Sequence, residues 1–191
     1  MIKVGIVGNI GSGKSYVAKQ FLCPVFDADT EVNKIYLKDK NCYKKIKKTL
    51  PKFIKSFPIK KNEIGKAILN NKKNLKKIIK IVHPLIRKEM NSFIKKNKKE
   101  KMVVLDIPLL LENNLAKKNY ILVFVEAKEK DILKQIVKRK NYNSEIYKKL
   151  KSIQLPVEFK RKKSNFIIKN NFKSFYVKKS VKFIKNKILN K

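Results

Sequence analysis

The segment Gly8–Ser15 limits the possible folds of this chain more than any other part of its sequence. It reads Gly-Asn-Ile-Gly-Ser-Gly-Lys-Ser and fits the pattern G-x-x-x-x-G-K-[ST], in which a glycine-rich turn joins a strand to a helix. The apolar run Ile2–Val7 predicts that strand, and the helix is expected from Gly13 to about Leu22. The sequence therefore predicts a P-loop, which binds the phosphates of ATP or GTP.

The residue types in this loop suit phosphate binding. Glycines adopt backbone angles that turn successive N–H groups inward, and they leave no side chain in the way of the phosphates. The helix start at Gly13 adds free N–H groups and the positive end of a dipole. Lys14 can reach the β- and γ-phosphates, and the Ser15 hydroxyl can bind Mg²⁺. The predicted nucleotide-binding residues are Gly8, Asn9, Ile10, Gly11, Ser12, Gly13, Lys14, Ser15 and Tyr16.

Strand and helix patterns alternate along the rest of the chain. Further short strands are predicted at Pro24–Phe26, Met102–Leu105, Tyr120–Val125 and Phe166–Ile168. Most of Thr30–Lys99 is predicted to be helical, with interruptions at Pro51 and Pro58 and a new helix that opens at His83-Pro84. A helix is predicted at Lys128–Lys138, followed by a break at Asn141–Asn143. Two further helices are predicted at Ser144–Ile153 and Phe172–Leu189. This alternation predicts an α/β fold of the three-layer P-loop NTPase type, a mostly parallel five-stranded sheet flanked by helices.

Carboxylates are scarce in this chain, and several of them follow predicted strands. Asp27 and Asp29 come directly after the second strand, and Asp106 ends the third. Because ligands of parallel sheets bind beyond the carboxyl ends of the strands, these carboxylates are expected near the γ-phosphate. We interpret Asp29 as the base for an acceptor hydroxyl and Asp106 as a ligand of Mg²⁺. Asp27 is interpreted as a partner that either supports Asp29 from behind or is linked to Mg²⁺. Alternatively, one Asp caps a helix starting at Thr30, and Asp106 or Glu112 caps a later helix.

The charge of the chain is strongly positive. The 50 Lys and Arg residues and 14 Asp and Glu residues give a formal net charge of +36. Among these cations only Arg87, Arg139 and Arg161 are arginines, whereas surfaces that read nucleic acid usually use the two-pronged Arg as well as Lys. The composition therefore favours an AT-rich coding bias, and a surface selected to bind polyanions stays the alternative.

The rest of the composition indicates a cytoplasmic protein. Cys23 and Cys42 match no metal-binding spacing, and so few cysteines are typical of a reducing compartment. The chain begins Met-Ile-Lys-Val and enters a predicted strand, so no signal peptide is expected. Its apolar runs are too short to span a bilayer. We expect no membrane contact, no specific nucleic-acid partner, and a monomer or weak homo-oligomer.

The only histidine, His83, precedes Pro84. A single histidine in this context is more often structural than catalytic, and phosphoryl transfer from ATP does not require one. Arg87, one helical turn later, is better suited to bind an anionic substrate.

Several segments together resemble the dephospho-CoA kinase family, in the order that the family shows. They are Gly8–Ser15, Asp27-Ala28-Asp29, His83-Pro84-Leu85-Ile86-Arg87, Asp106-Ile107-Pro108-Leu109-Leu110-Leu111-Glu112, Arg139, Gln154 with Pro156, and Asn170. The resemblance covers nearly the whole chain. It implies that ATP phosphorylates the ribose 3′-hydroxyl of dephospho-CoA to give CoA and ADP, with Mg²⁺ as the metal cofactor.

The resemblance also implies three structural parts and a set of residue roles. The nucleotide-binding core would comprise residues 1–29, 100–138 and 163–191, the helical CoA-side subdomain residues 30–99, and the lid residues 139–162. A lid would exclude water that otherwise hydrolyses ATP. The implied catalytic residues are Asp29, Lys14 and Arg139, the substrate-binding residues are Asp27, His83, Arg87 and Lys61, and the metal ligands are Ser15 and Asp106.

Five positions depart from the pattern of the family. Asn9 replaces a glycine, Tyr16 a threonine, Lys61 and Gln135 arginines, and Asn165 an aspartate. Lys61 keeps the positive charge but loses the two-pronged geometry of arginine.

Two other functions stay open from the sequence. One is another P-loop kinase of small molecules or nucleoside monophosphates, against which the Asp-Ala-Asp and Asp-Ile-Pro-Leu-Leu segments argue. The other is a basic nucleic-acid-binding ATPase, which the charge suggests but which no helicase motif or base-reading module supports.

Overall fold

The computed structural model describes residues 1–113, 115–139 and 142–190, apart from the side chain of Lys72. Asn141, part of the predicted break, lies outside the described residues. The chain divides into two compact units, the first made of Met1–Asp27, Phe93–Tyr142 and Ile153–Lys191 and the second of Ala28–Ser92 and Asn143–Ser152. Whether residues 139–162 act as a lid stays a prediction.

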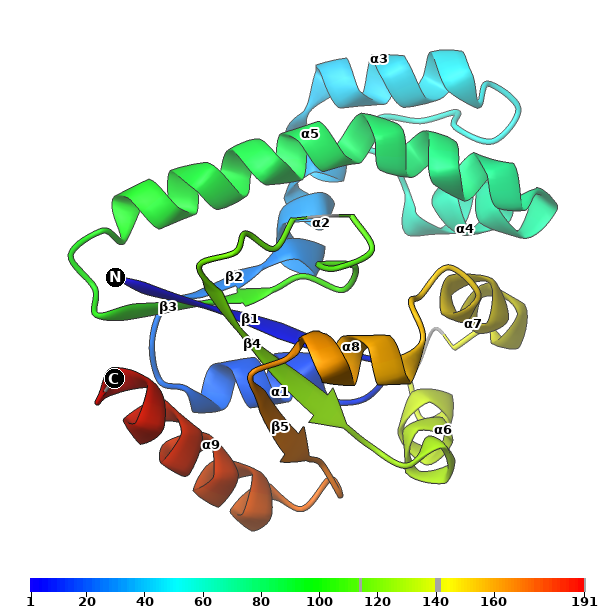
Figure 1. Cartoon of the computed structure of the whole chain (residues 1–191). Helices are drawn as coiled ribbons and strands as arrows, with labels where there is room; N and C mark the ends of the chain where they lie inside the picture. The colour runs from blue at the N-terminus through cyan, green and yellow to red at the C-terminus, as the bar shows by residue number, and fades with distance from the viewer. Residues whose placement is uncertain (114, 140–141, 191) are drawn as a thin grey trace. The chain divides into compact units, whose positions relative to one another are not determined.

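A parallel sheet forms the centre of the first unit (Figure 1). The described residues contribute five strands in the order β2-β3-β1-β4-β5, and each neighbouring pair is parallel. The strands are β1 (Ile2–Gly8), β2 (Val25–Asp27), β3 (Met102–Asp106), β4 (Tyr120–Glu126) and β5 (Phe166–Lys169). The predicted α/β fold with a parallel five-stranded sheet is therefore confirmed. Because β1 lies at the centre, the loop that follows it is flanked by the ends of β3 and β4.

The first unit also contains the helices α1 (Lys14–Gln20), α6 (Glu129–Val137), α8 (Val157–Lys163) and α9 (Ser174–Leu189). Helix α1 packs against β1 and β3, and α9 packs against β5. Alternate residues of β1, Val4 and Ile6, are fully buried in one cluster with Val17 of α1 and Val181 of α9. Helix α8 lies against β1 and β4. The apolar alternation of β1 thus explains why α1 and α9 cover one face of the sheet.

The second unit is helical. Its elements are α2 (Ala28–Lys38), α3 (Lys40–Thr49), α4 (Lys61–Asn70), α7 (Ser144–Lys151) and most of α5 (Lys72–Lys96). Short polar side chains start two of these helices. The Asp39 carboxylate accepts a hydrogen bond from the Cys42 amide at 2.8 Å, and the Asn143 side chain accepts one from the Ile146 amide at 2.9 Å.

Helix α5 contradicts one expectation from the sequence. It continues through Pro84, so the prediction that a new helix opens at His83-Pro84 is wrong. A proline inside a helix removes one backbone hydrogen bond and costs about 3 kcal/mol. The same apolar face continues on both sides of the proline, and its buried residues are Leu75, Ile78, Val82, Ile86 and Met90. Packing of this face outweighs the local cost of the proline.

Helix α2 begins earlier than the sequence pattern indicated. It starts at Ala28 rather than at Thr30, so Asp29 lies in its first turn and does not precede the helix as a cap. A carboxylate in a first turn interacts favourably with the positive end of the helix dipole, which explains why the helix extends to this point.

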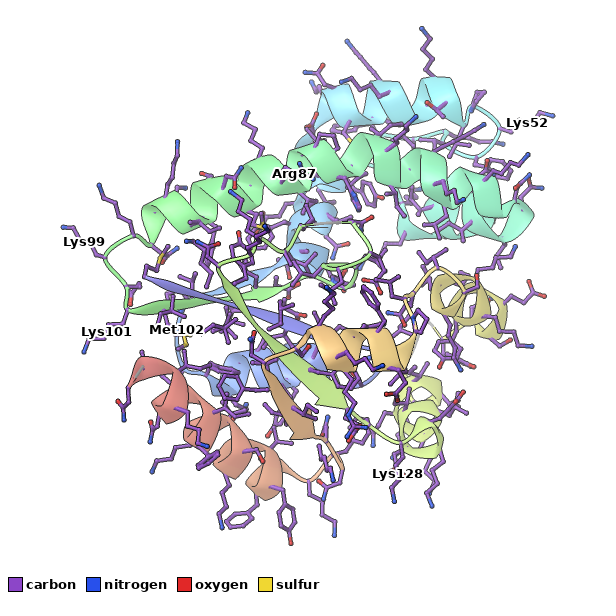
Figure 2. All side chains as sticks on the ribbon, viewed as in Figure 1. Lys52, Arg87, Lys99, Lys101, Met102 and Lys128 are labelled. Carbon is purple, nitrogen blue, oxygen red and sulfur yellow. The ribbon has the colours of Figure 1, made fainter. Side chains whose placement is uncertain are left out.

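Charged side chains cover the surface of both units. Figure 2 shows Lys52, Lys99, Lys101 and Lys128 extending away from the ribbon, and all four are exposed, whereas Met102 is buried at the start of β3. No helix within the described ranges combines the length and the apolar character that crossing a membrane requires.

Candidate active site

The loop from Gly8 to Gly13 joins β1 to α1 as the sequence predicts. Gly13 precedes the helix with φ 88° and ψ 22°, in the left-handed region that favours glycine. A Cβ atom at this position would also collide with the side-chain nitrogen of Asn170. Ser15 and Tyr16 follow in the first turn of α1, and both are exposed. Glycine is therefore required at position 13 by both backbone conformation and packing.

The ammonium group of Lys14 lies across the loop. Its Nζ donates to the carbonyl oxygens of Gly8 at 3.1 Å and of Asn9 at 2.9 Å, and the residue is only 8% exposed. These two bonds hold a positive charge beside the loop residues predicted to bind phosphate. The cost of partly burying the ammonium is reduced because both carbonyls accept from a charged donor.

One flank of the loop is held by Asn170, which follows β5. Its Nδ2 donates to the Ser12 carbonyl at 2.8 Å, and its Oδ1 accepts from the Phe172 amide at 2.8 Å. Asn170 is 4% exposed and Ser12 is fully buried. In the sequence, Asn170 belongs to the segments that resemble the dephospho-CoA kinase family, but no role was predicted for it. Its place directly after the last parallel strand, where ligands of such sheets bind, was the available signal.

The other flank is held by the segment from Gln154 to Lys160. The Gln154 side-chain oxygen accepts from the Ile10 amide at 3.0 Å, and Lys160 Nζ donates to the Asn9 side-chain oxygen at 3.1 Å. Lys160 Nζ also forms an ion pair with Glu112 at 3.3 Å. Burial lowers the pKa of Lys160, and the neighbouring Glu112 carboxylate partly opposes that shift. The sequence could not distinguish Lys160, because lysine is by far the commonest charged residue of the chain.

Two predicted carboxylates meet at the edge of the sheet that carries the loop. Asp27 of β2 and Asp106 of β3 are partners in the register of these parallel strands. β3 pairs on its other side with β1, which leads into the loop. Asp106 is 4% exposed and Asp27 is half-buried. The topology therefore brings both carboxylates to the carboxyl edge of the sheet, next to the strand before the P-loop.

The donor set at this edge fits Mg²⁺. Mg²⁺ prefers oxygen ligands and is usually bound by one or two carboxylates together with substrate phosphates. Ser15 lies in α1, just after the loop that follows β1, and Asp106 is the last residue of the neighbouring strand β3. Among the described residues, no group of three or more His, Cys, Asp or Glu side chains forms a metal cluster. A site completed by nucleotide phosphates needs no such cluster.

The other predicted residues lie in the second unit or at the end of α6. Asp29 lies one residue beyond Ala28, the start of α2, and Lys61 is the exposed first residue of α4. Arg139 is exposed in the turn after α6, where the Tyr142 amide donates to its carbonyl at 3.0 Å. Arg87 is exposed on α5 (Figure 2).

The imidazole of His83 is half-buried on α5. Burial lowers its pKa, and the positive charge of Arg87 lowers the pKa further. The neutral form is therefore favoured, and whether His83 has a structural role or binds substrate stays a prediction.

These features define the class of the protein. A parallel sheet with a central β1, a glycine-rich loop leading into α1 and a lysine held across that loop constitute a P-loop nucleotide-binding fold.

Comparisons with known proteins identify the family within this class. A sequence model of the family described as dephospho-CoA kinase matches residues 2–175. Dephospho-CoA kinases of Wolbachia pipientis wMel and of Wolbachia sp. subsp. Brugia malayi (strain TRS) are each 34% identical over 186 residues, which is 95% of this chain and 95% of theirs. The chain belongs to the dephospho-CoA kinase family, and it is a kinase.

Solved structures share the fold. The TT1252 protein from Thermus thermophilus has a TM-score of 0.80 at 24% identity, with 98% of this chain and 97% of that chain covered. The dephospho-CoA kinase from Campylobacter jejuni has a TM-score of 0.64 at 24% identity, with 97% and 96% covered. A shikimate kinase from Acinetobacter baumannii has a TM-score of 0.58 at 15% identity, with 100% and 95% covered. The neighbours are thus P-loop kinases or proteins with their fold.

Proposed function

We propose that this protein transfers the γ-phosphoryl group of ATP to the ribose 3′-hydroxyl of dephospho-CoA, giving CoA and ADP. The observation that carries the proposal is the P-loop with Lys14 bonded across it, in a chain that matches dephospho-CoA kinases over 95% of its length. A phosphoryl group in transfer carries charge on its oxygens, so catalysis depends mainly on positioned donors and cations.

The phosphates of ATP would be bound by the loop from Gly8 to Tyr16. Its backbone amides would donate to phosphate oxygens, and Lys14 would exchange its carbonyl partners for the β- and γ-phosphates. Ser15 and Asp106 would hold Mg²⁺, which when bound neutralises charge on the β- and γ-phosphates. The buried position of Asp106 beside β1 and the exposed hydroxyl of Ser15 support these assignments.

Asp29 is proposed as the base that orients the acceptor hydroxyl and takes its proton. It follows the carboxyl end of β2 by two residues and lies in the first turn of α2. Asp27, whose register partner is Asp106, would support it or contact the substrate. This division of roles follows from the position of Asp27 inside the strand and of Asp29 beyond it.

The remaining proposed contacts involve cationic side chains. Arg87 and Lys61 are exposed in the helical unit and would bind the anionic groups of dephospho-CoA, with His83 beside Arg87. Arg139 would contribute to a lid of residues 139–162 and cover the phosphates. We further propose the nucleotide-binding core, helical subdomain and lid as the working parts of the enzyme, which would act in the cytoplasm as a monomer or weak homo-oligomer.

The direct test of the function is the release of ADP in the presence of ATP and Mg²⁺ with a panel of acceptors. The panel comprises dephospho-CoA, AMP, dTMP and shikimate. We expect rapid ADP release with dephospho-CoA only, with a product phosphorylated at the ribose 3′ position by phosphorus NMR. Folded protein that binds ATP but does not turn over dephospho-CoA would exclude the proposed reaction.

The role of Asp29 is tested by the substitution Asp29→Asn. As a base, Asp29 contributes to the chemical step, so kcat should fall roughly 10²–10⁴-fold while the dissociation constant of ATP changes little. Asp39→Asn is a matched control, because Asp39 caps α3 and should leave kcat unchanged. A collapse of ATP binding in Asp29→Asn would instead assign this residue to metal binding or to the structure.

A further inference from the structure

A buried lysine outside the P-loop contacts the loop. Lys160 of α8 is 1% exposed. Of the lysine side chains that the structure describes, only Lys160 and Lys14 are buried. A coding bias toward lysine adds solvated side chains and does not account for an ammonium group inside the protein. Burying an ammonium group is costly unless it is paired and hydrogen-bonded, so its partners indicate why it is there.

The Lys160 ammonium interacts with two side chains, Glu112 and Asn9. Glu112, from the loop after β3, pairs with Nζ at 3.3 Å, and its Oε1 also accepts from the Leu155 amide at 3.1 Å. The Asn9 side-chain oxygen accepts from Nζ at 3.1 Å. Glu112 compensates the charge, whereas Asn9 is neutral and adds a directed contact. The contact with Asn9 is therefore the part of this network that links Lys160 to the loop.

Asn9 connects the two buried lysines. Its side-chain oxygen accepts from Lys160, and its backbone carbonyl accepts from Lys14 Nζ at 2.9 Å. The next amide, that of Ile10, donates to Gln154 at 3.0 Å. Asn9 and Ile10, the second and third residues of the loop, are thus both held by the segment from Gln154 to Lys160. Asn9, which Lys160 contacts through its side chain, also provides a carbonyl that binds Lys14.

We propose that Lys160 is a positioning residue of the nucleotide site. By donating to the Asn9 side chain it fixes the second residue of the P-loop, so that the Asn9 carbonyl holds the Lys14 ammonium where the phosphates bind. Glu112 keeps Lys160 in place by compensating its charge. The proposal rests on the proposed function for its kinetic consequences, but nucleotide binding tests it without any acceptor.

The test is a double-mutant cycle with Asn9→Ala, Lys160→Met and the two combined. The dissociation constants of ATP and ADP are measured by calorimetry, and kcat and the KM values of both substrates by ADP release. A bond to a charged donor predicts that each single variant weakens ATP binding about 10-fold. Because both remove the same contact, the double variant should be within about 2-fold of the weaker single variant. The KM of dephospho-CoA should stay within about 2-fold.

Three variants distinguish a positioning role of Lys160 from a non-specific loss of stability. Asn9→Ala leaves the Lys160–Glu112 pair intact, so its effect cannot come from an uncompensated buried charge. The pair Lys160→Met with Glu112→Gln removes both charges and should weaken ATP binding as Lys160→Met does. Lys163→Met alters an exposed lysine of the same helix that lies outside the proposed lid and should leave ATP binding unchanged.

Two outcomes would overturn the proposal. If the single effects multiply in the double variant, Lys160 does not act through Asn9. If Asn9→Ala binds ATP normally while Lys160→Met mainly lowers the melting temperature, Lys160 only anchors α8. Failure of the proposed reaction is distinguishable, because wild-type protein would then bind ATP normally without phosphorylating dephospho-CoA.

Discussion

The side chain of Asn170 donates from Nδ2 to the backbone carbonyl of Ser12 at 2.8 Å, across 158 positions of the chain. Because Asn170 directly follows β5 and Ser12 lies in the P-loop, this bond ties the end of an edge strand to the phosphate-binding loop. Both residues are buried, so neither group can exchange its partner for water.

The substitution Asn170→Ala should therefore impair nucleotide binding. It leaves the buried Ser12 carbonyl without its donor and frees the loop, so we expect the KM of ATP to rise about 10-fold. Asn171→Ala is the matched control, because Asn171 is exposed and its side chain accepts from the nearby Lys173 amide. Steady-state kinetics of both variants at saturating acceptor measure the difference. Equal ATP KM values in the two variants would show that the Asn170 bond does not support the loop.

Gly13→Ala should disrupt the loop more strongly. The φ of 88° strains any residue with a Cβ atom, and that atom would collide with the Asn170 side chain. We expect ATP affinity to fall at least about 100-fold, as measured by calorimetry. Gly65→Ala in α4 is the control, because its Cβ would lie 3.4 Å from the Ile146 side chain and would not collide with it. Alanine is favoured within a helix, so that variant should bind ATP normally and melt at an equal or higher temperature.

Lys14→Met should reduce both ATP binding and turnover. The variant keeps the length of the side chain but loses the charge that would interact with the β- and γ-phosphates, so kcat should fall roughly 10²–10³-fold. Lys19→Met, an exposed lysine of the same helix, should leave kcat unchanged. Stopped assays with radiolabelled ATP measure both. A Lys14→Met enzyme with normal kcat would remove Lys14 from the chemical step.

His83 predicts a dependence of stability on pH. Its pKa in the folded protein is below the ordinary value of 6.5 because of burial and of Arg87, so between the two pKa values the unfolded chain binds more protons. The free energy of unfolding should therefore fall as the pH falls from 6.5 through the folded pKa. His83→Gln should remove this pH dependence of the free energy of unfolding. Urea unfolding of both proteins at pH values from about 7.5 to about 5, which bracket the ordinary histidine pKa, would measure the difference. Parallel pH profiles of the two proteins would contradict the prediction.

Local patterns predicted the sheet and the loop correctly. The apolar run of Ile2–Val7 and the glycines after it depend on neighbouring residues only, and the structure places a buried strand and a left-handed Gly13 there. Two local predictions failed. Pro84 lies within α5 because packing of the apolar residues on both sides of it in one buried face outweighs the local cost of the proline. Helix α2 starts at Ala28, two residues before the predicted position, with Asp29 in its first turn.

The amino-acid sequence alone is enough to predict a phosphate-binding loop between a strand and a helix, because glycine, lysine and serine at those spacings act through local backbone geometry. The roles of Asn170 and Lys160, which hold the two flanks of that loop, are visible only in the folded protein. Their contacts join residues about 150 positions apart, and neither residue type stands out in a chain rich in Asn and Lys. Burial and strand order select these two side chains, and both depend on how the whole sheet assembles.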